Sequence, residues 1–212
     1  MGCCNGRLEA SSALQTKSIL EINSTLIRIV EGDISTQATD AIVNSTNATL
    51  TLDVGEAKAI LTKGGFKLRA ECIEYVNLHG PLEVAEVAVT SGGALPCRHI
   101  IHVVAPIYVN GRRGEPENLR KAILSVLEAA ESLHCESISI PAIATMPYAY
   151  PKDECASLLV KTTRTFLITR ARRLKFLYFV SSDKFTIRYL QKARDSLARE
   201  ECILDSSSSS HL

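Results

Sequence analysis

Short apolar segments alternate with segments of helical period through the second half of the chain, and this alternation constrains the fold more than any other feature. Between residues 119 and 133, apolar residues recur at steps of three and four, so they share one face of a helix. Residues 174–180 are almost continuously apolar, which is typical of a strand in a parallel sheet covered on both faces. The alternation predicts an α/β fold, with helices on both faces of a mainly parallel sheet.

The remaining elements follow from the same periodicities. Strands are expected at residues 19–22, 26–31, 41–43, 86–90, 99–104, 137–140 and 174–180, and helices at residues 55–79, 119–133, 151–170 and 183–200. The first helix should break at Gly64 and Gly65, and Pro151 suits the first position of the third helix. Residues 1–18 are predicted to form a flexible arm and residues 201–212 a Ser-rich tail, which leaves one domain at residues 19–200.

Composition narrows the class of function. Hydrophobic residues make up 46% and charged residues 22% of the 212 residues, which describes a globular domain rather than a disordered chain. The 24 Lys and Arg against 23 Asp and Glu leave a net charge of +1, so a broadly basic nucleic-acid binder is not expected. No apolar run reaches the roughly 18–20 residues of a membrane-spanning helix, and the polar N-terminus lacks the apolar core of a secretory signal. We therefore expect a cytoplasmic or nuclear protein.

The cysteines give no sign of a metal or disulfide framework. There are 7 of them, at scattered spacings and without a C-x-x-C pair. We expect most of them to be small buried apolar residues, and we expect neither a metal nor a cofactor.

Five segments then occur in a fixed order on the expected strands and turns. They are GDI at 32–34, DAIVNSTN at 40–47, LPC at 95–97, IIHVVAP at 100–106 and SISIPAI at 137–143. Together they resemble the macrodomain family, whose members are ADP-ribose-binding modules, and the resemblance covers about residues 19–200. It implies a three-layer α/β/α sandwich with a central mixed, mostly parallel sheet.

Two groups within the family look closest, and both are better known as readers than as hydrolases. The segment GPLEVA at residues 80–85 is similar to the macrodomain of the macro-histone variant. Residues 44–47 and 102–106 look like the macrodomains of the multi-macrodomain ADP-ribosyltransferases.

The resemblance implies ligand-binding roles at the ends of strands. Asp33 would accept a hydrogen bond from the adenine amino group, although an Asp after Gly is also a common helix cap. Asn47 would contact the distal ribose, with a turn residue as the alternative. Tyr150 would pack on the distal ribose, or act as a hydrophobic staple before Pro151. The other residues expected to line the ligand are Ile34, Gly55, Glu56, Ala57, Ala144, Thr145, Met146 and Tyr148.

Other polar and glycine residues near these segments are interpreted as structural. His102 lies in an apolar strand and is expected to be a satisfied core histidine. Asn44 should support the end of its strand, and residues 91–93 should form a tight turn.

The first phosphate loop departs from the family pattern. The family carries a run of glycines after the Asn, but residues 50–57 hold only Gly55, and Asp53 and Glu56 add negative charge. Gly55 still precedes a helix N-terminus, which favours anions. Hydrolytic members place an Asp where this chain has Ala57, and a methyl group cannot transfer a proton. Efficient hydrolysis is therefore not expected.

The second phosphate loop departs further. Its three expected glycines are replaced by Ala144, Met146 and Ala149, and Pro147 removes one backbone donor. Each lost charge-assisted hydrogen bond costs about 1.5–3 kcal/mol, so two losses would weaken binding about a hundredfold or more. Met146 and Tyr148 are candidates to fill the groove instead. The turn at residues 181–183 also lacks an aromatic that stacks on adenine, unless Phe185 takes that place.

The N-terminus carries a separate signal. Met1-Gly2-Cys3-Cys4 resembles the start of dually acylated proteins, with myristate on Gly2 and palmitate on Cys3 and Cys4. Gly6 departs from the preferred Ser or Thr, and the alternative is an ordinary start with two free cysteines. Two acyl chains would give stable membrane association.

A basic cluster precedes the last strand and allows two interpretations. A solvated helix end, whose cations oppose the helix dipole, is the first. A patch for nucleic acid or anionic lipid is the second. The cluster consists of Arg164, Arg170, Arg172, Arg173 and Lys175.

The sequence predicts a monomeric, stand-alone reader that binds ADP-ribose, a related nucleotide or an ADP-ribosylated protein without efficient catalysis. One alternative is a degenerate macrodomain with impaired ADP-ribose binding that serves as a protein or nucleic-acid interaction module. The other is a weak ADP-ribosyl hydrolase or a deacetylase of O-acetyl-ADP-ribose.

Overall fold

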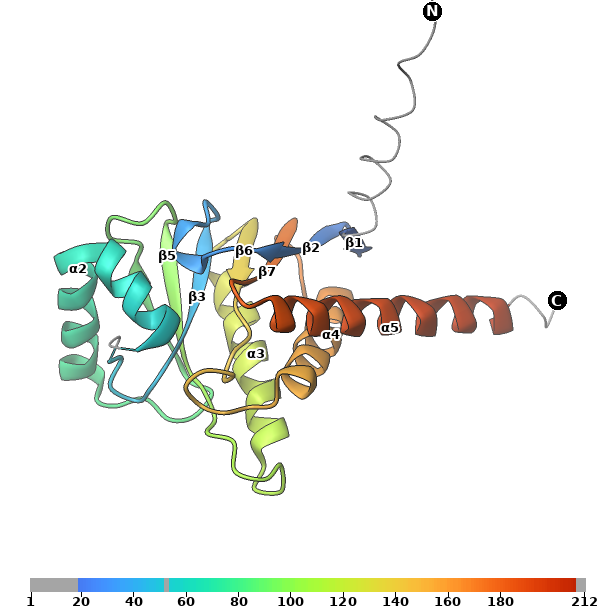
Figure 1. Ribbon diagram of the computed structural model, residues 1–212. Coiled ribbons are helices and arrows are strands. Elements are labelled where there is room, and N and C mark those ends of the chain that lie inside the picture. Colours follow the sequence, from blue (N-terminus) through green and yellow to red (C-terminus); the bar gives the residue numbers. More distant parts are fainter. Residues whose placement is uncertain (1–18, 52–53, 209–212) are drawn as a thin grey trace, which may run out of the picture.

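The protein is described by a computed structural model that covers residues 19–51 and 54–208 (Figure 1). Within these residues, seven strands form one mixed sheet in the spatial order β1-β2-β7-β6-β3-β5-β4. The strands are β1 (Ile19–Ile22), β2 (Thr25–Glu31), β3 (Ala41–Thr46), β4 (Val87–Ser91), β5 (His99–Val104), β6 (Ser137–Ile140) and β7 (Phe176–Ser181). The five inner strands run parallel, and β1 and β4 are antiparallel edges. The mainly parallel sheet is confirmed.

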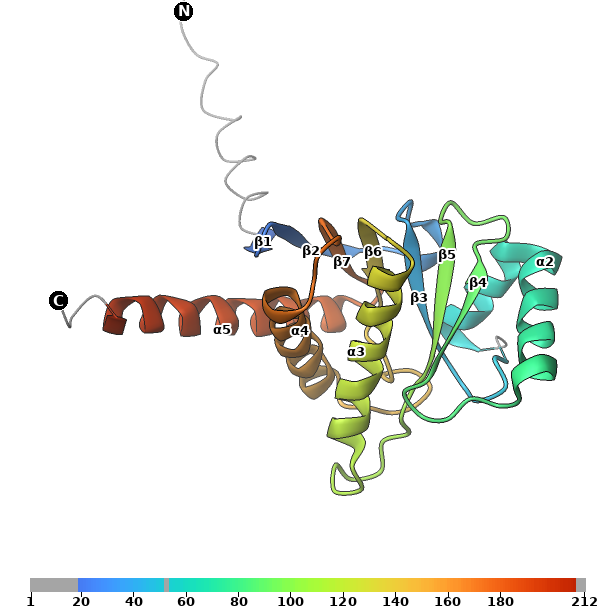
Figure 2. The same ribbon diagram turned by 180° about the vertical axis from the view of Figure 1, so that it is seen from behind.

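Helices cover both faces of this sheet. They are the short 3-10 helix η1 (Ile34–Thr36), α2 (Gly55–His79), α3 (Glu115–Ser132), α4 (Lys152–Thr169) and α5 (Lys184–Ser208). Figures 1 and 2 show α2 on one side of the sheet and α3 and α4 on the other, with α5 packed along α4. The expected three-layer α/β/α sandwich is therefore confirmed.

Several element boundaries differ from the sequence prediction: α3 begins at Glu115 rather than at residue 119, and β3 continues to Thr46 rather than ending at residue 43. Pro151 is the residue that caps α4, one position before the helix, rather than its first residue. Helix α5 was expected to end near Glu200, but it continues to Ser208 and extends beyond the sheet (Figure 1). Serine lowers helix propensity only slightly, so a Ser-rich composition does not by itself end a helix.

The core follows from the alternation of strand side chains. On β3, Ala41 and Val43 face the layer of α3, α4 and α5, whereas Ile42 faces α2. On β5, Ile101 faces the layer of α3, α4 and α5, and Ile100 faces α2. Both faces of the inner strands are buried, which explains their near-continuous apolar sequence.

His102 lies in the core beneath α2, as expected. Asn44 Nδ2 lies 3.1 Å from Nδ1 of His102, and Thr90 Oγ1 lies 2.8 Å from Nε2. Because an amide nitrogen only donates, Nδ1 accepts and the ring proton sits on Nε2, where it donates to Thr90. Burial lowers the pKa of His102 to about 4, so the ring stays neutral. Asn44 was expected to support the end of its strand, but it lies inside β3 and holds the His102 ring.

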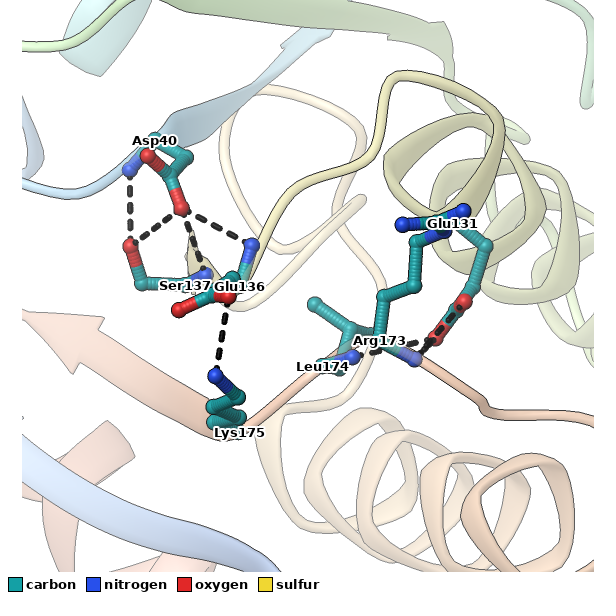
Figure 3. Close-up of polar contacts among 7 residues, drawn as sticks. All are labelled: Asp40, Glu131, Glu136, Ser137, Arg173, Leu174 and Lys175. Carbon is teal, nitrogen blue, oxygen red and sulfur yellow. Dashed lines mark hydrogen bonds and ion pairs between the residues drawn. The ribbon is translucent and has the colours of Figure 1, made fainter.

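The basic cluster lies at the amino-terminal edge of the sheet, where acidic groups meet it (Figure 3). Lys175 Nζ lies 2.8 Å from Glu136 Oε1, and Arg170 pairs with Glu128. The Glu131 carboxylate accepts the backbone N–H groups of residues 172–174. This pairing favours the interpretation as a solvated helix end over that of a nucleic-acid patch.

Asp40 joins two parallel strands at the same edge. Its carboxylate accepts the backbone N–H groups of Glu136 and Ser137, at 2.8 and 2.9 Å, and the Ser137 hydroxyl at 3.0 Å (Figure 3). The start of β3 is thereby fixed beside the start of β6, which sets where both strands end at the opposite edge.

Other sequence expectations concern cysteines, membranes and the termini. Cys72, Cys97, Cys135 and Cys155 are buried free thiols. In the part of the chain that the structure covers, no helix combines the length and apolar character needed to cross a bilayer. The same residues offer no group of three or more His, Cys, Asp or Glu that could hold a metal ion. The predicted acylation sites Gly2, Cys3 and Cys4 lie outside the described residues.

Candidate functional site

The parallel strands all end at one edge of the sheet, and the loops that follow them carry the predicted ligand-binding residues. Asp33 follows β2, Asn47 follows β3, and Tyr148 lies in the loop after β6. The helix α2 begins at the same edge, with Glu56 in its first turn. Crevices at the carboxyl ends of parallel strands are the usual ligand sites of such sheets.

Asp33 is held in place by hydrogen bonds of its own. Its Oδ1 accepts Ser35 N at 2.8 Å and Ser35 Oγ at 2.6 Å, so it caps η1. Its Oδ2 lies 2.7 Å from Lys63 Nζ. Desolvation opposes ionisation, but Lys63 and the Ser35 donors outweigh it and lower the pKa of Asp33. The capping alternative is thus observed, and an adenine amino group would have to share or displace the Lys63 contact.

The first turn of α2 combines a glycine, an acid and a methyl group. Gly55 has φ 56°, a conformation that glycine adopts without strain. Ala57 is buried and presents only its methyl group. Glu56 is exposed at the edge of the site, yet desolvation and the negative charge of Asp33 raise its pKa. An ionised Glu56 here would repel a diphosphate.

The loop after β6 retains backbone geometry that its sequence did not predict. Ala144 and Ala149 have φ values of 68° and 59°, in the left-handed region that favours glycine. The loss of the glycines therefore does not abolish the left-handed backbone at these two positions. The donors are partly occupied, because Ala144 N donates to Ser45 Oγ at 3.3 Å.

The groove between this loop and the start of α2 is closed by side chains. Its remaining cavity is about 10 Å³, enough for about one water molecule. Glu56, Ala57, Met146 and Tyr148 all line it, as the sequence predicted for the ligand groove. Tyr148 is half-buried, whereas Met146 is 73% exposed and therefore lines the groove without filling it.

Tyr150 does not face this groove. It is 2% exposed, and its ring packs edge-on against Tyr108 with centroids 4.9 Å apart. Burial and the nearby negative charge of Glu154 raise the pKa of Tyr150 to about 12. Tyr150 and Cys155, which lies on the first turn of α4, share one core cluster, as in a hydrophobic staple. Tyr148 lines the groove instead.

The other predicted residues contribute in different ways. Asn47 Oδ1 accepts Thr51 N at 3.0 Å, so its turn role is observed, and the residue is exposed. The side chain of Ile34 is buried in the core under α2, so only its backbone could reach a ligand. Thr145 Oγ1 donates to the backbone oxygen of Ala142 at 2.8 Å and is half-buried.

Comparison with known proteins agrees with this geometry. The family model described as Macro domain matches residues 43–159. The chain belongs to the macro domain family. Other sequences extend the similarity over most of this macro domain. A protein of Citrobacter rodentium named O-acetyl-ADP-ribose deacetylase is 36% identical over 166 residues, which cover 78% of this chain and 93% of that protein. An uncharacterized protein of Sulfurisphaera tokodaii is 42% identical over 139 residues, or 66% of this chain and 75% of its own length.

Solved macro domains share the fold closely. A mutant macrodomain of Oceanobacillus iheyensis with ADP-ribose superposes with a TM-score of 0.81 at 33% identity, covering 85% of this chain and 98% of that one. This similarity agrees with the seven-stranded sheet and the helices around it.

Sequence reasoning missed several residues of this macro domain's site. Lys63 was not expected to pair with Asp33, because the two lie 30 residues apart and only the fold joins them. The apolar residues Ile107 and Val109 were also missed. Their signal was present, since they lie in the turn that follows the end of β5 at Val104, and such turns are usual ligand sites.

Proposed function

We propose that this macro domain binds ADP-ribose, free or attached to a protein, and does not hydrolyse it efficiently. The similarity to a macrodomain solved with ADP-ribose supports the binding. Asp33 and Asn47 follow the parallel strands β2 and β3 at the same edge of the sheet, and together with the left-handed backbone at Ala144 and Ala149 they support it further. The observation that carries the reader assignment is Ala57, a buried methyl group where hydrolytic members carry a carboxylate. The reader groups of the sequence prediction share this lack of a carboxylate.

Binding has to open the groove. A cavity of about 10 Å³ cannot admit a diphosphate, so the side chains that line it must move aside. Only molecules with an open groove can bind, so the apparent affinity for ADP-ribose falls in proportion to their fraction. We expect binding about a hundredfold weaker than with glycine-rich loops, as the two lost hydrogen bonds also suggest.

Calorimetric titration with ADP-ribose tests the proposal. Wild type should give saturable heat, and Asp33→Ala and Asn47→Ala should abolish it. The matched control is Glu117→Ala, which removes an exposed carboxylate that pairs with Arg120 on the surface of α3. Absence of heat at millimolar ADP-ribose, with a native circular dichroism spectrum, would refute ADP-ribose binding.

The charge of Glu56 offers a second test in the opposite direction. Glu56→Gln removes a negative charge beside the expected phosphate position, so ADP-ribose affinity should rise several-fold. Glu74→Gln makes the same change at an exposed position farther along α2 and should have no effect. Equal effects of the two variants would show that Glu56 does not lie near the phosphates.

The closed groove favours one alternative, a degenerate macro domain that binds no ADP-ribose and serves as a protein interaction module. The titration separates the two, because the module predicts no heat at any ligand concentration. Salt-dependent binding to RNA would instead revive the basic cluster as a nucleic-acid surface.

A weak hydrolase is the other candidate, and two observations favour it. A relative 36% identical is named O-acetyl-ADP-ribose deacetylase, and Glu56 places a carboxyl group of raised pKa beside the cavity. We expect no turnover of mono-ADP-ribosylated protein or of O-acetyl-ADP-ribose above background. Turnover that Glu56→Gln or Asn47→Ala removes would overturn the reader assignment.

A further inference from the structure

A second cavity, of about 450 Å³, lies beside the closed groove at the end of β5. Tyr148 lines both, and Asn47 lines the second. Val104 and Ala105, at the end of β5, form part of its apolar wall. Most of the residues that line it are apolar, so the cavity favours an apolar group.

The rim of this cavity is also apolar and exposed. Val84, Ile107 and Val109 are 46%, 69% and 56% exposed. Single exposed apolar residues are ordinary on protein surfaces. Three of them around one apolar cavity form a continuous apolar surface, which marks interaction sites.

The outer wall of the cavity is preformed. Glu115, 3% exposed, accepts the backbone N–H groups of Val109 at 3.1 Å, Asn110 at 3.2 Å and Gly111 at 3.3 Å, and that of Arg113. Desolvation opposes ionisation, but these backbone donors outweigh it and hold the pKa of Glu115 at about 2. The carboxylate thus fixes residues 109–113 in one conformation, so a ligand meets a rigid wall.

The wall is also joined to the ADP-ribose site. Tyr108 N donates to the backbone oxygen of Tyr148 at 3.0 Å. This hydrogen bond joins the loop after β5 to the loop after β6. The apolar cavity therefore lies directly beside Asn47 and Tyr148, the residues expected near the distal ribose.

We propose that this cavity receives an apolar side chain of the polypeptide that carries the ADP-ribose. The inference rests on the proposed function, since Asn47 is expected at the distal ribose and proteins are attached through that sugar. A polypeptide fits better than a small acyl group, because the exposed rim of Val84, Ile107 and Val109 extends the apolar surface beyond the cavity. The preferred partners then carry Leu, Ile, Val, Met or Phe within a few residues of the modified side chain.

Synthetic peptides with one ADP-ribosylated residue test this. Two peptides differ only by Leu or Ser beside the modified residue, and free ADP-ribose is the reference ligand. Wild type should bind the Leu peptide about tenfold more tightly than the Ser peptide. Ile107→Asp should reduce this ratio to about one. The matched control is Ile168→Asp, which alters an exposed isoleucine on α4 and should leave the ratio at about ten.

Each outcome bears on a different step. Equal binding of the two peptides by a protein that binds ADP-ribose would overturn this inference and leave the proposed function intact. No binding of any ligand would overturn the proposed function itself. A gain from longer acyl chains on O-acyl-ADP-ribose without a peptide preference would assign the cavity to a small-molecule acyl group and overturn the polypeptide partner. A ratio that falls equally with Ile168→Asp would show that the preference does not depend on the cavity.

Discussion

Single residues of the loop after β6 show that a backbone conformation can persist without the glycines that usually support it. Ala144 and Ala149 remain left-handed, which costs about 1–2 kcal/mol for a residue with a Cβ. Tyr150 N donates to the backbone oxygen of Ala144 at 3.0 Å, and Ser45 Oγ accepts Ala144 N. The first contact closes the loop on itself and the second ties it to β3, 99 positions earlier in the chain, which a local sequence rule could not predict.

Replacing Ala149 by glycine should relieve this strain. Ala149 is exposed, so Ala149→Gly removes no packed group and should stabilise the fold by about 0.5–1 kcal/mol. Ala70→Gly, at an exposed position in α2, is the control and should destabilise by about 1 kcal/mol. Urea unfolding followed by circular dichroism measures both. A loss of stability in Ala149→Gly would show that the loop does not strain this residue.

Tyr148 and Tyr150 mark the limit of sequence reasoning at this scale. The resemblance assigned the ribose contact to Tyr150, but Tyr150 is buried and Tyr148 faces the cavity. Two tyrosines two positions apart cannot be told apart by type, because the choice depends on how the loop meets Tyr108 in the core. Position in the chain alone therefore identifies the loop but not the side chain.

At the scale of elements, helix α2 is broken where it meets the turn after β4. Gly65 has φ 78°, and the Gly64 carbonyl oxygen accepts Ala94 N at 3.1 Å. A Cβ on Gly93 would lie 2.3 Å from that oxygen. The sequence predicted both the break and the turn, but not that each requires the other, because 28 residues separate Gly65 from Gly93.

Gly93→Ala tests this packing. Gly93 has φ 60°, and the added methyl group would also clash with the backbone of α2, so we expect a loss of about 3 kcal/mol. The control is Gly114→Ala, at φ 81°, where the added methyl group would have no heavy atom within 4 Å and the loss should be about 1 kcal/mol. Thermal and urea unfolding give both values. Similar losses would mean that conformation alone, and not the contact with α2, requires glycine at position 93.

At the scale of the whole molecule, the order of strands and helices was predictable because burial on both faces leaves a strong apolar signal. The α/β/α layers followed from it, and the break in α2 followed from Gly64 and Gly65. The closed groove and the second cavity did not, since both depend on where side chains such as Met146 and Ile107 come to rest between distant loops.

Acylation would place the whole molecule at a membrane. If Gly2 is myristoylated and Cys3 or Cys4 palmitoylated, two acyl chains anchor the protein stably, whereas one would not. Metabolic labelling with a myristate analogue should label wild type and not Gly2→Ala. Fractionation should then move the variant from membranes to the cytoplasmic or nuclear fraction. Label that does not depend on Gly2 would refute N-terminal myristoylation.

Stability of the whole fold should depend on pH through His102. Its pKa of about 4 in the folded protein lies below the ordinary value of 6.5, because it is fully buried. Below pH 6.5 the unfolded chain takes up a proton that the folded protein refuses, so stability falls until about pH 4. The loss amounts to about 3 kcal/mol over this window. The lowered pKa values of Asp33, Asp40 and Glu71 act at lower pH.

Urea unfolding between pH 7.5 and 4.5 measures this loss by comparing wild type with His102→Gln. Because the pKa of Glu56 is raised in the folded protein, its protonation stabilises the fold as pH falls. This contribution to the free energy of unfolding is the same in both proteins and cancels in the difference. The variant should lose less stability than wild type over this range, while His79→Gln, at an exposed position, should follow wild type. If His102→Gln does not fold, NMR titration of the ring in wild type replaces the comparison. In the folded protein Nδ1 of His102 accepts a hydrogen bond from Asn44, so it is not free to take a second proton. A ring that titrates near pH 6.5 without unfolding would therefore contradict the prediction. Parallel stability curves for wild type and His102→Gln would contradict it as well.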